Sequence, residues 1–423
     1  MYKKIQFRNK ARLIEVPFKD TKAVTIFFLF GVGSRYESLD INGVSHFIEH
    51  LMFKGTKKRP TTLDISKELD RVGAEFNAMT SKDYTGYYIK INYEKVGLAI
   101  DVLSDMILNS KFDKEEIDRE RGVIVEEINM YNDNPLLYIE SLFEEAVFAG
   151  NPLSREISGP AEVIRKITRE KIVAYRDKFY RADNVVVALA GRIDNKIRKL
   201  VEEKFINKLP VDKGKKEKFS KFDLKQKSPR IKIQYKDSKQ VQLALGFPTF
   251  GYNDRRVYAL HLLSIILGGN MSSRLFVSIR ERRGLAYFVR CYPNYFQDTG
   301  NIVIQSGLDI NRLEEAIKVI IDELKAIKKT GATAKELADA KEFLRGKIIL
   351  NLEDSSNLAE YYAKQEILTD KIYTPEEKMM MYQKVTIRDI QNIAKEFFVK
   401  NRLNLALIGP FRSAKKFYPY FKI

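Results

Sequence analysis

Two of the three histidines in this 423-residue chain lie four positions apart, within residues 45–53, SHFIEHLMF. The surrounding pattern predicts a helix that Asn42 can cap and that Lys54-Gly55 can end. Positions i and i+4 share a helix face, so His46 and His50 can reach one metal ion. Glu49 lies on nearly the same face, where it can contact a water at the metal without being a ligand.

The spacing His-x-x-Glu-His is the inverted form of the zincin motif. Residues 43–56, GVSHFIEHLMFKGT, closely resemble the active-site helix of the pitrilysin family of zinc peptidases, which includes insulin-degrading enzyme and the mitochondrial processing peptidase. The resemblance covers essentially the whole chain. The length of the chain is similar to that of proteins in the short bacterial, processing-peptidase-like branch of the family. The resemblance implies one zinc ion per chain and the hydrolysis of peptide bonds.

Two histidines leave a catalytic zinc one protein ligand short. The family's third ligand is a glutamate 76–77 residues after the second histidine, which allows Glu126 or Glu127. The family has a second important glutamate seven residues earlier. Glu120 and Glu127 share a helix face, whereas Glu126 points roughly 100° away. The resemblance therefore implies Glu127 as the ligand and Glu120 as a carboxylate that orients the site. Cys291 is the wrong ligand type for this family.

The second half of the chain offers a different pair of polar residues. Residues 272–287, SSRLFVSIRERRGLAY, resemble the family's signature for an arginine and a tyrosine seven residues apart, here Arg280 and Tyr287. In relatives this pair faces the zinc and holds the substrate carbonyl, and both groups can stabilise a developing oxyanion. Without the family, the segment reads as a basic helix that ends at Gly284, with Tyr287 in a strand.

A strand after the histidine helix is a candidate for substrate binding. Residues 73–80, GAEFNAMT, resemble the edge strand against which relatives lay the substrate, with Asn77 and Ala78 as candidate contacts. An extended peptide adds to such an edge through backbone hydrogen bonds, which gives binding with little sequence specificity. The segment also reads as an ordinary strand after a glycine.

The elements that position these residues occur twice. Residues 166–168 (KIT) and 384–386 (KVT) are separated by the same offset as 188–191 (ALAG) and 406–409 (ALIG). We interpret 1–209 and 230–423 as two copies of one fold, joined by a lysine-rich linker over 210–229. In the second copy, His261, Ser264, Ile265 and Asn351 take the places of the first copy's two histidines and two glutamates, so this copy has no zinc site.

Each copy groups its strands and its helices, which favours an α+β fold with helices packed on one face of a sheet. In the first copy, the patterns predict strands over 23–33, 85–91 and 185–190, and helices over 42–54, 63–72, 96–109 and 114–131. The resemblance implies that the two homologous domains form half of a clamshell chamber.

Composition narrows the class of protein. Lys and Arg exceed Asp and Glu by 18, yet the charge is mostly dispersed, apart from seven lysines in 213–227. Tryptophan and any recognisable nucleic-acid motif are absent, so we expect no nucleic-acid partner. No apolar run reaches the length of a membrane span, and one cysteine excludes an internal disulfide. The N-terminus lacks signal-peptide and transit-peptide features, so we expect a cytoplasmic protein.

Together these features predict a zinc metalloendopeptidase. His46, His50 and Glu127 hold the metal, Glu49 is the general base, and Arg280 with Tyr287 stabilises the oxyanion. Larger family members join four such domains, so the resemblance implies that this two-domain chain forms a homodimer with active sites shared between subunits. A catalytically dead structural subunit, like the core subunits of the respiratory cytochrome complex, is the alternative, but this chain retains every motif residue.

Overall fold

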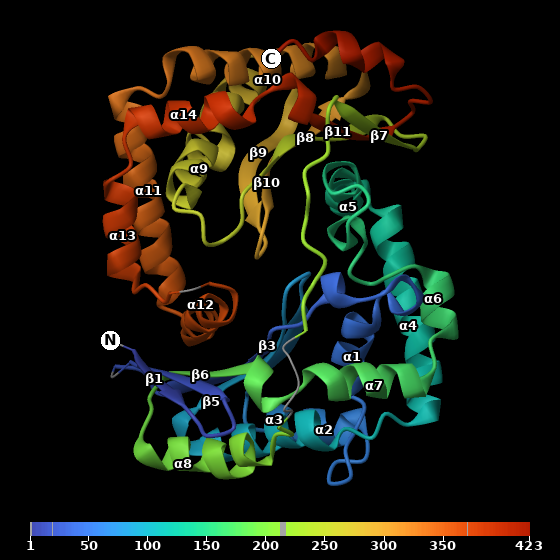
Figure 1. Cartoon of the computed structure of the whole chain (residues 1–423), viewed down its shortest axis with the longest axis vertical. Coiled ribbons are helices and arrows are strands. Elements are labelled where there is room, and N and C mark those ends of the chain that lie inside the picture. The colour runs from blue at the N-terminus through green and yellow to red at the C-terminus, as the bar shows by residue number, and fades with distance from the viewer. Residues whose placement is uncertain (1, 19, 212–216, 370) are drawn as a thin grey trace. The chain divides into compact units, whose positions relative to one another are not determined.

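The computed structural model describes residues 2–18, 20–211, 217–369 and 371–423. The chain forms two compact units. Unit 1 contains residues 1–129, 156–220 and 349–374, and unit 2 contains residues 130–155, 221–348 and 375–423. Each unit is built around one β-sheet (Figure 1). The α+β class is confirmed.

The sheet of unit 1 has six strands in the order β1-β2-β6-β3-β5-β4. Only β2 and β6 run parallel; the other neighbours are antiparallel. The strand β4 therefore forms one edge. The strands are β1 (Lys3–Gln6), β2 (Arg12–Pro17), β3 (Ala23–Phe30), β4 (Glu75–Thr80), β5 (Thr85–Asn92) and β6 (Val185–Gly191).

The sheet of unit 2 repeats this plan without a counterpart of β1. Its order is β7-β11-β8-β10-β9, with β7 and β11 parallel and the other neighbours antiparallel. Apart from β1, the two sheets have the same strand order and the same strand directions, as expected for two copies of one fold. The strands are β7 (Arg230–Tyr235), β8 (Gln240–Thr249), β9 (Ala286–Tyr295), β10 (Gly300–Asp309) and β11 (Asn404–Gly409).

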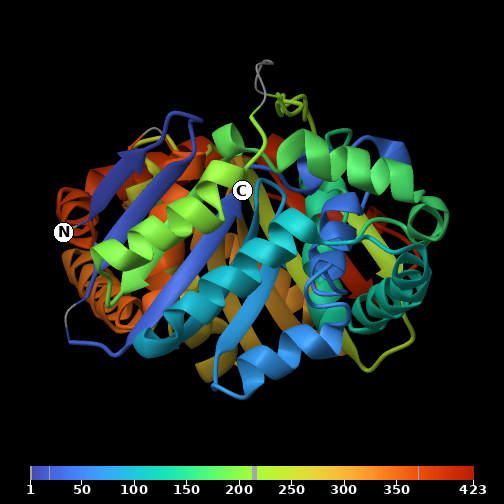
Figure 2. The ribbon, with the colours of Figure 1, turned by 90° about the horizontal axis from the view of Figure 1, so that it is seen from below.

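Helices of the first repeat cover one face of the sheet in unit 1, and Figure 2 shows α3 and α8 lying across it. Alternate side chains of β3, including Val24, Ile26 and Phe28, join the core under these helices. The helices are α1 (Val44–Met52), α2 (Thr62–Asp70), α3 (Val96–Asn109), α4 (Lys114–Asp133), α6 (Ala161–Lys166), α7 (Arg169–Phe179) and α8 (Asn195–Lys204).

The opposite face of each sheet is covered by a helix from the other half of the chain. In unit 1, α12 (Ser355–Leu368) packs on β3 and β6, where Ser355 hydrogen-bonds Thr25 at 2.8 Å. In unit 2, α5 (Pro135–Val147) packs on β8 and β11, and its Phe143 joins a core with Ala244 and Ala406. The sequence pattern had indicated helices on one face only, so these two helices are an addition to the predicted plan.

The remaining helices belong mainly to unit 2 and pack on the other face of its sheet. Their apolar side chains join Leu243, Leu245 and Phe247 of β8 in one core. The helices are α9 (Val257–Ser264), α10 (Leu313–Thr330), α11 (Ala334–Leu352), α13 (Pro375–Gln383) and α14 (Ile387–Phe397).

The exchange of α5 and α12 predicts how the chain behaves when it is divided. Separate fragments 1–220 and 221–423 each leave an apolar sheet face without its covering helix, because that helix is on the other fragment. Co-expressed fragments should therefore co-purify through a tag on one of them, and each expressed alone should aggregate. Two fragments that purify separately as folded monomers would contradict this reading of the fold.

The chain passes from unit 1 to unit 2 at three places, and one of them, between Ser220 and Lys221, lies in the lysine-rich segment. Residues 212–216 lie outside the described residues. In the described part, the Arg35 guanidinium lies 3.8 Å from the ring centre of Phe219, and Phe222 packs against Phe148. Because each unit combines pieces of both repeats, the repeat boundaries stay a prediction.

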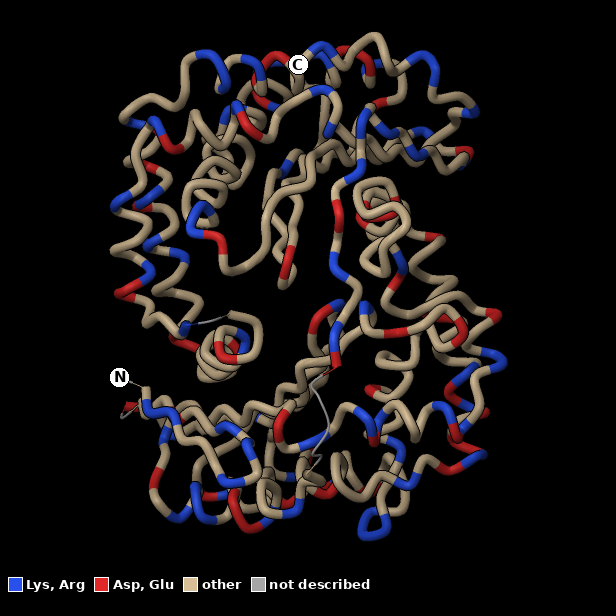
Figure 3. The backbone as a smooth tube through the Cα atoms, viewed as in Figure 1, with Lys and Arg blue, Asp and Glu red and all other residues tan. Residues whose placement is uncertain are grey.

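The distribution of charged residues and the hydropathy of the helices agree with the dispersed charge and the lack of a long apolar run noted in the sequence. Figure 3 shows Lys and Arg interspersed with Asp and Glu along both units. Within the described ranges, no helix combines the length and the apolar character that crossing a bilayer requires.

Candidate active site

A buried acid holds the first turn of α1, the helix that carries both histidines. Glu37 accepts hydrogen bonds from the backbone amides of Gly43 (2.7 Å) and Ser45 (2.8 Å). Burial raises the pKa of this carboxyl, and the hydrogen bonds oppose that rise. The expected cap, Asn42, donates its side-chain amide to Glu37 instead (2.9 Å), so the prediction that it caps the helix was wrong.

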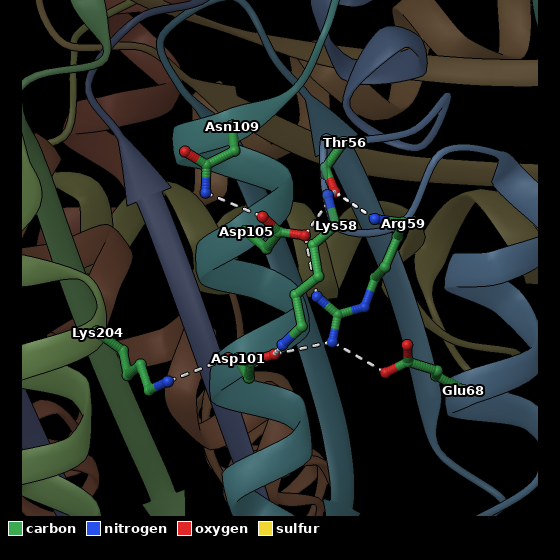
Figure 4. A network of polar contacts seen from close by, with 8 residues as sticks. All are labelled: Thr56, Lys58, Arg59, Glu68, Asp101, Asp105, Asn109 and Lys204. Atoms are coloured by element: carbon green, nitrogen blue, oxygen red, sulfur yellow. Dashed lines mark hydrogen bonds and ion pairs between the residues drawn. The ribbon is translucent and has the colours of Figure 1, made fainter.

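A polar network fastens the turn after α1 to α3 (Figure 4). The buried Arg59 side chain donates to Asp105 (2.9 Å) and Asp101 (2.8 Å) on α3, and to Glu68 (2.9 Å) on α2. The hydroxyl of Thr56 donates to Asp105 and accepts from the amide of Arg59. Because both ends of α1 are fastened within unit 1, its polar face has a fixed position.

Both histidines point from α1 toward the same carboxylate on α4. Glu127 Oε2 lies 3.4 Å from His50 Nε2 and 3.7 Å from His46 Nε2. One possible ligand atom from each of these three residues lies within 4.8 Å of the other two. Two imidazoles and one carboxylate form a donor set that would hold a divalent ion and would leave it a coordination position for water.

The structure distinguishes the two glutamates that spacing alone left open. On α4, Glu127 is half-buried beside the histidines, whereas Glu126 is exposed. Ile124 and Ile128, on the buried side of α4, anchor the helix in the core. Glu127, the glutamate that helical phase favoured over Glu126, is therefore the one that the structure brings to the histidines.

Glu120 lies behind His50 and is almost fully buried. Its Oε2 is 3.1 Å from His50 Nδ1, and its Oε1 is 2.6 Å from Lys54 Nζ. A hydrogen bond donated by Nδ1 to Glu120 directs Nε2 of His50 toward Glu127, where this nitrogen would bind a metal ion in place of its proton. Lys54 supplies the positive charge that balances the buried carboxylate.

The electrostatics of the cluster suit a cation. Burial opposes a charge on His50, but Glu120 and Glu127 outweigh that penalty and raise its pKa to about 9. Burial and the neighbouring His50 lower the pKa of His46 to about 4. The hydrogen bond with His50 lowers the pKa of Glu127. The two carboxylates thus favour positive charge at His50, which a metal ion can supply in place of the proton.

Glu49 projects from α1 beside the histidines. Its Oε2 accepts a hydrogen bond of 2.5 Å from the hydroxyl of Thr80, the last residue of β4. Burial raises the pKa of the Glu49 carboxyl, while this hydrogen bond opposes the rise. A raised pKa suits a group that must accept a proton and later return it.

Asn77 and Ala78 lie in β4 and therefore on the free edge of the sheet, as the sequence predicted for this strand. Asn77 is exposed, and its side-chain oxygen accepts a hydrogen bond from the amide of Ala78 at 2.8 Å. Whether this edge receives substrate stays a prediction.

Arg280 and Tyr287 belong to unit 2, and the structure brings these two residues together. Gly284 turns the chain at φ +56° between them, and the guanidinium lies 5.5 Å from the centre of the Tyr287 ring. In β9, Ala286 and Phe288 pair with adjacent residues of β10, so Tyr287 occupies a bulge. Its side chain is 80% exposed, and its hydroxyl has no hydrogen-bond partner among the described residues.

The corresponding helix of unit 2, α9, holds no metal cluster among the residues described. Its His261 is half-buried, and its Nδ1 lies 2.9 Å from the hydroxyl of Tyr382. Burial lowers the pKa of this imidazole to about 4. His261 is thus a packed histidine.

Sequence reasoning missed three residues that contact the candidate catalytic groups or their helix: Glu37, Lys54 and Thr80. Lys54 and Thr80 both lie in segments that were singled out for the resemblance. Their contacts depend on how α4 and β4 pack on α1, which no local spacing reveals.

Comparison with known proteins supports the resemblance. Residues 15–161 match the family model described as insulinase, peptidase family M16, and residues 166–344 match the M16 inactive domain. The uncharacterised zinc protease YmxG of Bacillus subtilis is 34% identical over 97% of this chain and 98% of its own length. An uncharacterised zinc protease of Streptomyces coelicolor is 33% identical over 95% of this chain and 88% of its own.

The chain belongs to the M16 peptidase family. A protease from Helicobacter pylori has the same fold, with a TM-score of 0.92 and 24% identity over 97% of this chain and 99% of its own. M16 membership and the zinc protease relatives identify zinc as the cofactor. The donor set of His46, His50 and Glu127 fits that ion in number, type and mutual distance.

Proposed function

We propose that this M16 protein is a zinc-dependent endopeptidase that cleaves peptides or unfolded and precursor polypeptides. Its family and relatives already make it a zinc-dependent peptidase; cleavage within a chain is the further step. The observation that carries the proposal is the convergence of His46, His50 and Glu127, with the Glu49 carboxylate on the same helix.

The residues of this chain divide the chemistry among them. Bound zinc lowers the pKa of water and polarises the scissile carbonyl. Glu49 accepts the proton of the attacking water and then donates it to the leaving amine, while the Thr80 hydroxyl donates a hydrogen bond to its Oε2. Glu120 fixes the ring of His50 through Nδ1, with Lys54 balancing its charge.

The substrate in this proposal is an extended strand. The free edge of β4 offers backbone groups that pair with any peptide, and Asn77 and Ala78 are the proposed contacts. Mass spectrometry of a mixed peptide library after incubation tests this reading. Cuts at internal bonds support an endopeptidase, whereas removal of single terminal residues would replace it with an exopeptidase.

The residues that we propose to stabilise the oxyanion, Arg280 and Tyr287, lie in unit 2. The Arg280 guanidinium lies 5.5 Å from the ring centre of the exposed Tyr287, and a guanidinium and a phenol hydroxyl are both groups that can stabilise an oxyanion. We propose that the chain forms a homodimer, in which the pair of one subunit serves the zinc site of the other within a closed chamber.

Subunit mixing tests the shared site. The variants Glu49→Gln and Tyr287→Phe should each be nearly inactive as homodimers. After subunit exchange, half of the dimers are mixed and each holds one intact site, so activity should return to about a quarter of wild type. If exchange is verified by mass spectrometry and activity does not return, each site is built within one chain.

A further inference from the structure

The strand β4 and the helix α1 are fastened to each other at two points. Near the start of β4, the ring of Phe76 stacks with that of Phe53, which follows α1, at a centroid distance of 6.2 Å. At the end of the strand, the Thr80 hydroxyl donates to Glu49 at 2.5 Å. Phe76, Ala78 and Thr80 alternate along the strand and therefore share one face.

The second fastening point engages the candidate base directly. Glu49 is partly buried, and the described part of the chain gives its carboxylate a single hydrogen-bond donor, Thr80. One donor on Oε2 restricts the rotation of the carboxylate and leaves Oε1 without a hydrogen-bond donor from the described residues. Without that donor, the carboxylate can rotate about the bond to its methylene, because this terminal torsion has a broad range.

We propose that Thr80 is a positioning residue that sets the orientation of the Glu49 carboxylate and ties it to the substrate edge β4. This inference rests on the proposed function, since it needs Glu49 as the base. The strand that would pair with the peptide backbone then also fixes the group that accepts the proton of water. The same six-residue strand would thus position both the peptide backbone and the Glu49 carboxylate.

The test compares Thr80→Val, which keeps the shape and removes the hydroxyl, with Thr80→Ser, which keeps the hydroxyl. With a fluorogenic peptide that wild type cleaves, Thr80→Val should lower kcat by about 10- to 100-fold, the order of loss that a misplaced catalytic group causes. Its KM, zinc content and Tm should stay near wild type. Thr80→Ser should restore most of kcat.

Thr25→Val is the matched control. It removes a buried threonine hydroxyl that bonds Ser355 at 2.8 Å in the same unit, on the sheet face away from α1. It should leave kcat near wild type. The inference is overturned if Thr80→Val keeps kcat, if Thr80→Ser is as impaired as Thr80→Val, or if only KM changes. A wild-type protein that holds zinc and cleaves no peptide would overturn the proposed function instead.

Discussion

Replacing Glu49 by Gln should lower peptide turnover by about 10²- to 10⁴-fold, the contribution typical of a general base. The amide has the size of the carboxylate but cannot accept a proton from water at neutral pH. Glu49 is not among the three residues whose ligand atoms converge, so the variant should still hold zinc. Steady-state cleavage of a fluorogenic peptide and metal analysis of the same preparation measure both quantities.

The control for the Glu49→Gln variant is a measurement of its thermal stability. The introduced amide can still accept the hydrogen bond from Thr80 through its side-chain oxygen, so the Tm should stay close to that of wild type. Loss of zinc together with activity would mean that Glu49 is a ligand. Retention of full turnover would remove it from the chemistry.

The second large effect is expected from neighbouring residues on α4. Glu127→Gln should weaken zinc binding by more than about 100-fold, because it removes the only anionic donor among the three ligands. Glu126→Gln changes the charge equally, yet its side chain is exposed and outside the cluster, so zinc affinity should be unchanged. Competition with a chromophoric chelator gives both affinities. An equal loss in the two variants, or a loss in Glu126→Gln alone, would contradict the assignment.

The three-residue metal set could be predicted because its geometry is mostly local. His46 and His50 share a face by helical spacing alone, and the phase of Glu120 and Glu127 selected the glutamate that the structure brings to them. What links α1 to α4 was not local: the resemblance supplied that step. Thr80 and Lys54 stayed hidden because their contacts arise from packing between elements far apart in sequence.

The fold shows the same division between local and long-range information. The predicted strands and helices of the first copy lie within a few residues of their observed bounds. The exchange of α5 and α12 was not foreseen. A signal for it was present, since β6 is a continuous apolar run and β3 is apolar except for Thr25, a pattern typical of strands buried on both faces. The runs indicate that a second layer exists, but not which segment provides it.

The most direct test of the account is the metal content of the wild-type protein, measured together with its activity. Protein purified without a chelator should contain about one zinc per chain and cleave peptides. Dialysis against a chelator should remove both the metal and the cleavage, and added zinc should restore them together. Peptide cleavage that persists in protein with no stoichiometric divalent metal would contradict the central claim.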